Sequence, residues 1–196
     1  RQVVEYGIEA LKAVWHRGAV DADGKTGDGA GIHVEIPKDF FIEKIEVTGH
    51  DYDNSEICVG MIFLPRNDYS SQESCKTIVE SELTKNDFSI YGWRQVPVNP
   101  KILGQKAFQT MPEIIQVLFK SNNPNLVDKD LERKIYETRK KIENKAFESS
   151  LNNFYICSIS SKSIIYKGLY LAEAISDFYL DLKDKRFISR YAIFHQ

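Results

Sequence analysis

The stretch Trp15–Ile36, which reads Trp-His-Arg-Gly-Ala-Val-Asp-Ala-Asp-Gly-Lys-Thr-Gly-Asp-Gly-Ala-Gly-Ile-His-Val-Glu-Ile, decides how the first part of the chain folds. It is rich in glycine, at positions 24, 27, 29 and 31. Glycine lacks a Cβ atom, so the backbone there either adopts a positive φ or comes very close to other atoms. Charged residues at 17, 21, 23, 25 and 28 surround these glycines. Composition alone therefore leaves two interpretations open, a binding loop and a solvated turn.

The segments on either side of this loop have clear hydrophobic patterns. Apolar residues before it recur at the spacing of one buried helical stripe, namely Val4, Ile8, Leu11 and Trp15. We therefore expect a helix over residues 2–15. After the loop, Ile32, Val34 and Ile36 alternate with polar residues as far as Pro37, which predicts a strand.

The rest of the chain predicts further strands and helices in mixed order. Strands are expected at residues 57–64, 88–98 (as an edge strand), 115–119, 154–160, 163–167 and 187–195. Helices are expected at residues 71–84, 131–146 and around 171–175, whereas residues 101–111 show no clear pattern. Ser70 and Glu73 form a capping-box pattern at the start of the first of these helices. Only two residues separate 154–160 from 163–167, which predicts a tight hairpin.

Regular β–α alternation is too sparse in this pattern for a doubly wound sheet. We therefore predict an α+β fold, a layered sandwich of antiparallel sheet and helices.

The overall composition excludes several classes of protein. The chain has 196 residues, 42% of them hydrophobic and 28% charged, with a formal net charge of -2. A nucleic-acid or polybasic membrane partner would need a concentrated positive field, which this sequence lacks. No apolar run approaches the roughly 18 residues of a membrane span, and the first residues lack the apolar core of a signal peptide. We expect a cytoplasmic protein that binds neither nucleic acid nor membrane.

The three cysteines are widely separated, and each lies among apolar neighbours. Cys58, Cys75 and Cys157 therefore fit reduced core thiols better than a disulfide framework or a zinc site.

Three familiar glycine-loop motifs were tested against the loop. Gly24-Lys25-Thr26 matches the end of a phosphate-binding loop, but Ala19 occupies the position of its first glycine, and such a loop follows a strand and opens a helix. Asp21 and Asp23 resemble a calcium loop, but Lys25 stands where the next oxygen ligand belongs. The dinucleotide fingerprint fails because the later glycines lead into a strand.

Four separated blocks of the chain together resemble a known family. They are residues 10–31, Tyr91-Gly92-Trp93-Arg94-Gln95-Val96-Pro97, residues 154–168, and Phe194-His195-Gln196. In this order they are similar to the glutamine amidotransferase domain of glutamate synthase large subunits. The resemblance covers essentially the whole chain.

This resemblance implies a class II, N-terminal nucleophile enzyme with a four-layer αββα sandwich. In the family, the thiolate of a first-residue cysteine attacks the amide of L-glutamine, its free α-amine accepts the proton, and hydrolysis of the thioester gives glutamate and ammonia. The ammonia reaches a flavin domain that makes glutamate from 2-oxoglutarate. FMN and an iron–sulfur cluster bind in later domains, a small subunit can donate electrons, and the electron source is NADPH, NADH or ferredoxin.

The sequence departs from the family pattern at both ends. Residue 1 is Arg, whereas the family nucleophile stands more than ten residues earlier, and the three cysteines lack the free terminal amine that activates it. The family arginine that grips the glutamine carboxylate follows the His-Gln pair, and the Asn-Gly pair of the oxyanion hole lies further on. Residues 1–196 are therefore expected to be a single partial domain, truncated at both ends, inactive alone and without cofactor or metal.

Five residues are assigned by the resemblance to the site. Arg17 matches the family arginine beside the nucleophile, where it would orient the thiol or bear developing charge; the alternative is a structural arginine that binds loop carbonyls. His195 is assigned to the substrate pocket wall, the alternative being a packed strand histidine. Gly27, Asp28 and Gly29 are assigned as the scaffold that positions Arg17.

Two other functions remain open at this point. One is a nucleophile-less module of the same fold that senses glutamine or docks to a protein. The other is a different amidotransferase with a related domain.

Overall fold

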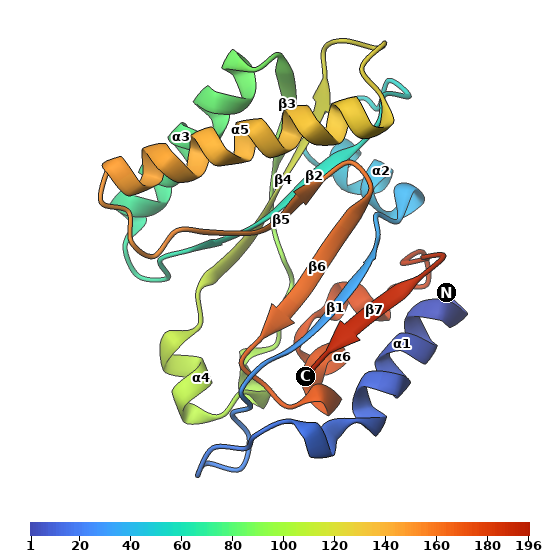
Figure 1. Ribbon diagram of the computed structural model, residues 1–196, viewed down its shortest axis with the longest axis vertical. Helices are drawn as coiled ribbons and strands as arrows, with labels where there is room; N and C mark the ends of the chain where they lie inside the picture. Colours follow the sequence, from blue (N-terminus) through green and yellow to red (C-terminus); the bar gives the residue numbers. More distant parts are fainter. The chain divides into compact units, whose positions relative to one another are not determined.

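The chain forms two compact units in the computed structural model, which describes residues 1–196 (Figure 1). The first unit comprises residues 1–40, 96–111 and 165–196, and the second comprises residues 41–95 and 112–164. The first contains a three-stranded sheet in the order β6-β1-β7, and the second a four-stranded sheet in the order β3-β4-β2-β5. Each sheet carries helices, so the predicted α+β class is confirmed.

The first unit is built from short elements that come from three parts of the chain. They are α1 (Gln2–Ala13), the 3₁₀ helix η1 (Trp15–Arg17), β1 (Ala30–Glu35), η2 (Pro100–Ile102), α4 (Gln105–Thr110), β6 (Ser163–Gly168), η3 (Ala172–Ala174), α6 (Ile175–Phe178), η4 (Leu180–Lys183) and β7 (Ala192–His195). The helix α2 (Lys38–Val47) follows β1.

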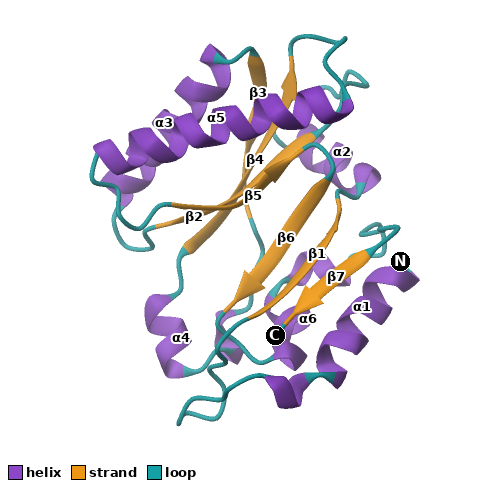
Figure 2. Cartoon of the chain, in the orientation of Figure 1, coloured by secondary structure: helices purple, strands orange, loops and turns teal.

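Helix α1 packs against β7 and β1 (Figure 2), but the predicted stripe is wrong at its last position, because Trp15 lies beyond α1 and is 61% exposed. Val4, Ile8 and Leu11 are buried. The backbone of α1 lies so close to β7 that a Cβ atom on Gly7 would come within 2.5 Å of the Cβ of Ala192. The regular helix ends at Ala13, earlier than expected, and the chain continues as the single turn η1.

Aromatic side chains fill much of the core of the first unit. Tyr166 lies edge-to-face with Tyr179 at 4.9 Å between ring centroids and with Phe187 at 5.6 Å. The Tyr166 hydroxyl donates to Asp181 Oδ2 at 3.0 Å, and the Tyr179 hydroxyl donates to the carbonyl of Lys167 at 2.8 Å. Buried tyrosines need such partners, because a buried hydroxyl without one costs free energy.

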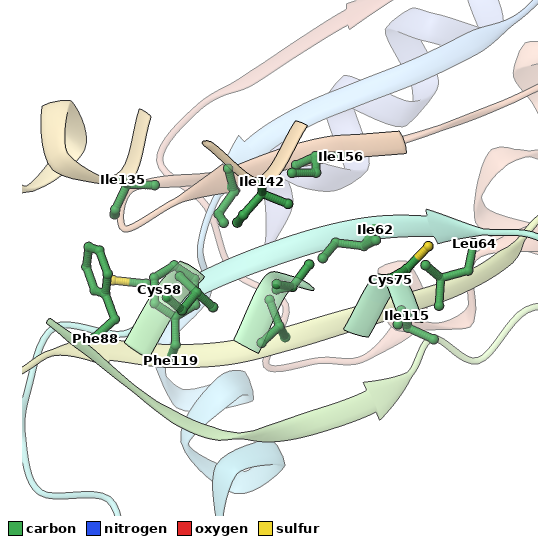
Figure 3. Close-up of a cluster of buried hydrophobic side chains, with 14 of the residues drawn as sticks. Cys58, Ile62, Leu64, Cys75, Phe88, Ile115, Phe119, Ile135, Ile142 and Ile156 are labelled. Carbon is green, nitrogen blue, oxygen red and sulfur yellow. The ribbon is translucent and has the colours of Figure 1, made fainter. Parts of the chain in front are cut away.

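The second unit has longer and more regular elements. They are β2 (Cys58–Leu64), α3 (Tyr69–Lys85), β3 (Phe88–Gln95), β4 (Glu113–Ser121), α5 (Asp128–Glu148) and β5 (Tyr155–Ser160). Helices α3 and α5 lie on one face of the sheet (Figure 1). A cluster of buried apolar side chains joins the sheet to these helices (Figure 3). As predicted, β3 is an edge strand.

The capping box expected at Ser70 and Glu73 is wrong, because the N-cap lies two residues before Ser70. Helix α3 begins at Tyr69, and Asp68 is its N-cap: the Asp68 carboxylate accepts from the Ser71 backbone N–H at 3.0 Å and from the Ser71 hydroxyl at 2.6 Å. An ionised carboxylate is the stronger acceptor for an unpaired amide at a helix start.

The predicted hairpin between residues 154–160 and 163–167 is also wrong. Both strands exist, but β5 pairs with β2, whereas β6 pairs in the other sheet. Two-residue hairpins favour Gly, Asn or Asp in their turns, and Ser161-Lys162 offers none. Instead the Glu132 carboxylate of α5 accepts from Ser160 Oγ at 2.9 Å and from the Ser161 backbone N–H at 2.7 Å, which holds the end of β5 against the helix. The final strand is likewise shorter than expected, because only Ala192–His195 pairs with β1.

Phe119 allows a direct test of the core of the second unit. Its ring is fully buried and lies edge-to-face with Phe88 at 5.3 Å. Phe119→Ala is expected to lower the free energy of unfolding by about 3–5 kcal/mol, because it removes buried apolar area and leaves a cavity. Phe147→Ala is the matched control: this ring is 82% exposed, so a change within about 0.5 kcal/mol is expected. Urea denaturation measures both, and equal effects would contradict the proposed core.

Candidate functional site

The glycine-rich loop forms a short hairpin whose tip, residues 22–25, is exposed to solvent. Val20 and Gly27 form an antiparallel bridge, and the Asp21 backbone N–H donates to the carbonyl of Thr26 at 2.9 Å. The Gly24 N–H donates back to the carbonyl of Asp21 at 2.9 Å, and Gly24 turns the chain with a φ of 70°. Such a φ favours glycine because a Cβ atom would clash with the backbone.

The Asp23 carboxylate stabilises this hairpin through hydrogen bonds to two of its residues, Lys25 and Thr26. Its Oδ1 accepts from the backbone N–H groups of Lys25 at 2.9 Å and Thr26 at 2.7 Å, and its Oδ2 accepts from the Thr26 hydroxyl at 2.6 Å. The Thr26 hydroxyl, followed by these backbone groups, holds the pKa of Asp23 well below its usual range. Both carboxylate oxygens are thus engaged by the loop itself, which is the local geometry of an Asx turn.

The hairpin is also fixed to α4. Gly104, the N-cap of α4, lies against Asp23 and Thr26, and a Cβ atom on it would come within 2.7 Å of Asp23 Cγ. The Lys106 ammonium pairs with Asp21 Oδ2 at 2.7 Å, and this bond lowers the pKa of Asp21. Residues 101–111 showed no clear pattern in sequence, yet they supply this support. The Asp23-x-x-Thr26 spacing was the available signal for the turn, but nothing local pointed to its partner at Gly104.

The three residues assigned as scaffold have different environments. Gly27 is buried, and a Cβ atom there would come within 2.5 Å of the carbonyl oxygen of Tyr170. Gly29 has a φ of 136°. The side chain of Asp28 is exposed and makes no hydrogen bond, and only its backbone N–H donates to the carbonyl of Ala19 at 3.3 Å. A scaffold role for this segment remains a prediction, and the two glycines are the residues with a steric reason for it.

Arg17 ends the turn η1 at the edge of the loop. Its backbone N–H donates to the carbonyl of Val14 at 2.9 Å, while its side chain is exposed and has neither an ion-pair nor a hydrogen-bond partner. The guanidinium therefore binds no loop carbonyl in this structure. Its charge is available to a ligand.

His195 lies on β7 opposite Gly31 of β1. A Cβ atom on Gly31 would lie 2.9 Å from His195 Nε2, so the ring occupies space that the glycine leaves open. The histidine is exposed rather than packed in the core. Its assignment to a substrate pocket remains a prediction.

The structure brings the end of β7 next to the turn that carries Arg17. The Gln196 side chain donates from Nε2 to the carbonyl of Trp15 at 3.1 Å. A Cβ atom on Gly18 would lie 2.8 Å from both Cγ and Cδ of Gln196. Arg17 precedes Gly18 and His195 precedes Gln196, so this contact brings the two assigned residues into neighbouring parts of the structure. Sequence reasoning assigned no role to Gln196 or Gly18.

The cysteines are buried free thiols, as predicted, and they lie on separate elements. Burial raises the pKa of Cys58 far above its usual value and raises the pKa of Cys75 to about 11. A thiol whose pKa is raised in this way is a poor nucleophile near neutral pH. No group of three or more His, Cys, Asp or Glu side chains is arranged to hold a metal ion. None of the helices has the length and apolar character needed to cross a membrane.

The family model of the class-II glutamine amidotransferases matches residues 1–196. The chain therefore belongs to this family, as its sequence blocks predicted. Among curated proteins it is similar to the large chain of the NADPH glutamate synthase of Azospirillum brasilense, with 54% identity over 196 residues. It is also 41% identical over 196 residues to ferredoxin-dependent glutamate synthase 1 of Arabidopsis thaliana and 34% identical over 195 residues to ferredoxin-dependent glutamate synthase 2 of Synechocystis.

The chain is much shorter than these relatives. The matches cover 100% of the chain but 13% of the Azospirillum protein, and 99% of the chain but 12% of the Arabidopsis and Synechocystis proteins. Residues 1–196 thus correspond to one portion of each of these proteins.

The Asp23 turn can be tested by hydrogen exchange. Asp23→Asn keeps an oxygen for the backbone N–H groups of Lys25 and Thr26, but its amide nitrogen cannot accept from the Thr26 hydroxyl. Exchange of these two amides is expected to be faster than in the wild type, and faster still in Asp23→Ala. Asp28→Asn is the matched control, because the Asp28 side chain makes no hydrogen bond, and it should leave both rates unchanged. Equal acceleration by both Asn variants would contradict the proposed turn.

Acidification provides a second arm of the same test. The pKa of Asp23 is lowered in the folded loop, whereas an unfolded Asp has a pKa of about 3.9. The stabilising contribution of the ionised carboxylate is therefore complete above about pH 4 and is lost as the pH falls toward the folded-state pKa. In the wild type, protection of the Lys25 and Thr26 amides, corrected for intrinsic exchange, should decrease as the pH is lowered from about 4. It should change little in Asp23→Asn, which has no carboxylate at this position.

Proposed function

We propose that residues 1–196 form part of the glutaminase domain of a glutamate synthase. In this proposal the domain hydrolyses L-glutamine to glutamate and ammonia, and the ammonia passes to a synthase domain that makes glutamate from 2-oxoglutarate. The observation that carries the proposal is the loop at Trp15–Gly31. This segment opens the resemblance to the family, and it folds around an exposed arginine whose charge is unpaired.

The nucleophile of this reaction is proposed to lie outside residues 1–196. A glutaminase of this class needs a thiolate that can reach the substrate amide and a base that takes its proton. Cys58, Cys75 and Cys157 are all buried and cannot meet a solvent-borne substrate without local unfolding. The reaction therefore requires a cysteine supplied by another part of the full-length protein.

Arg17 is proposed to support the chemistry rather than perform the attack. A fixed positive charge beside the reacting thiol stabilises the thiolate and the negative charge that develops on the amide oxygen. An exposed guanidinium at the end of the turn η1 provides such a charge without a desolvation cost in the free protein. His195, exposed at the end of β7, is proposed to line the glutamine pocket.

The cofactors of the synthase reaction are proposed to bind to the remaining domains. The three cysteines of this chain are buried on separate elements and are not grouped as cluster ligands. We propose that FMN and the cluster belong to the rest of the protein, together with any small electron-donating subunit. Residues 1–196 would then contribute ammonia to that chemistry and no redox group.

Isolated residues 1–196 are expected to hydrolyse glutamine at no measurable rate, because no accessible thiolate is present. The rate of hydrolysis is measured by chromatography of the glutamate released. Turnover that disappears in Cys58→Ala or Cys157→Ala would overturn the assignment of the nucleophile. Retained glutamine binding without turnover in the full-length protein would instead favour a glutamine-sensing module of the same fold.

Arg17→Ala in the full-length protein is expected to lower glutamine-dependent synthesis by about 100-fold, the usual cost of removing one group that stabilises developing charge. Ammonia-dependent synthesis should be spared, because it bypasses the glutaminase step. The glutamine-dependent rate of Arg17→Lys should lie between those of the wild type and Arg17→Ala, since lysine keeps the charge but not the planar guanidinium. Arg133→Ala, at an exposed arginine of α5, is the control and should leave both rates unchanged. Equal loss of both activities in Arg17→Ala would indicate a folding role instead.

A further inference from the structure

The turn η1, which carries Arg17, has little to hold it in place from its own side chains. None of its three residues is buried, and the Trp15 ring is 61% exposed. Its backbone makes two turn bonds, Arg17 N–H to the carbonyl of Val14 at 2.9 Å and Gly18 N–H to the carbonyl of Trp15 at 3.2 Å. A single turn with two bonds and no core contact is expected to sample other conformations.

Gln196 supplies the contact that the turn itself lacks. Its Nε2 donates to the Trp15 carbonyl at 3.1 Å, so this oxygen accepts both from the turn and from the end of β7. The contact joins residues 181 positions apart. His195 of β7 pairs with Gly31 of β1, and this pairing fixes the backbone position directly before Gln196.

The glycine at position 18 is required by the same contact. Its backbone has a φ of -93° and a ψ of 150°, which any residue adopts without strain. A Cβ atom there would nevertheless lie 2.8 Å from Cγ and Cδ of Gln196, well inside van der Waals contact. Gly18 and Gln196 are therefore fitted to each other, and the fit is steric rather than conformational.

The orientation of the Gln196 amide is set by its neighbours. If the amide were reversed, its oxygen would face the Trp15 carbonyl oxygen, so Nε2 must be the atom on that side. The other amide atom, Oε1, is buried and has no donor in the structure. Burial of an unsatisfied acceptor costs free energy, so the contacts with Trp15 and Gly18 must compensate for it.

We propose that Gln196 is a positioning residue for the glutaminase reaction: its contacts with Trp15 and Gly18 fix the turn η1 and thereby the direction of the Arg17 guanidinium. The inference rests on the proposed function, because it assigns Gln196 a role in that same site. Gln196 does not act on the substrate in this proposal. It acts through Arg17.

The first test uses the full-length protein and a substitution that removes the hydrogen bond with little change in volume. Gln196→Met is expected to lower kcat for glutamine-dependent synthesis by about tenfold, in line with the loss of one positioning hydrogen bond. Ammonia-dependent synthesis should not change. Gln109→Met, at an exposed glutamine of α4 without a side-chain hydrogen bond, is the matched control and should be silent. An unchanged glutamine-dependent rate in Gln196→Met would overturn the proposal.

The second test asks whether Gln196 acts through Arg17. In an Arg17→Ala background, adding Gln196→Met should cause no further loss, because the group to be positioned is already absent. The same tenfold loss in both backgrounds would overturn the positioning role and indicate a separate effect of Gln196.

The third test examines the geometry independently of activity. Gly18→Ala should lower the melting temperature, because the new methyl group collides with the Gln196 side chain. Adding Gln196→Ala should restore part of this loss by removing the colliding atoms. If Gly18→Ala is silent, or if the double variant is no more stable than Gly18→Ala, the proposed contact is wrong. If the wild-type protein does not hydrolyse glutamine while this compensation is observed, the contact stands and the proposed function fails.

Discussion

The first unit depends on the close approach of distant parts of the chain to backbone positions that lack a Cβ atom. The carbonyl of Tyr170 lies against Gly27, the ring of His195 against Gly31, and the side chain of Gln196 against Gly18. A Cβ atom added at any of these three glycines would lie closer to its neighbour than van der Waals contact allows. The glycines of one loop thus allow two later parts of the chain, at Tyr170 and at His195–Gln196, to lie against it. This steric constraint accounts for Gly18, Gly27 and Gly31, whereas Gly24 and Gly29 adopt positive φ values of 70° and 136°.

The charges of the same loop divide into two groups with different consequences. Asp21 forms an ion pair with Lys106 of α4, which fixes the hairpin onto that helix. Asp23 accepts hydrogen bonds from the hydroxyl and the backbone N–H of Thr26. Arg17 has no such partner. In the proposed reaction, this uncompensated charge would stabilise the negative charge that develops on the substrate amide.

The buried thiols explain why membership of the family does not by itself identify the reacting group. The class-II glutamine amidotransferase model spans the whole chain, and the similar glutamate synthases are about eight times longer, since the chain covers 13% or 12% of them. Within residues 1–196, every cysteine is a core residue, and burial raises the pKa of Cys58 and Cys75. In the proposed site, residues 1–196 supply the exposed Arg17 and the end of β7, and the nucleophile is proposed to come from the rest of the protein.

Local physics in the sequence determined the α+β class, the α1 stripe, the edge position of β3 and the buried state of the cysteines, because hydrophobic period and Pro placement act over a few residues. Membership of the family could also be seen from the spaced blocks. Tertiary structure alone decided that β5 and β6 join different sheets and that Gly104 receives the Asp23 turn. It also decided that Gln196 meets Gly18. These outcomes depend on partners far away in the chain, and no local pattern of charge or hydrophobicity specifies which distant atom will occupy the space that a glycine leaves.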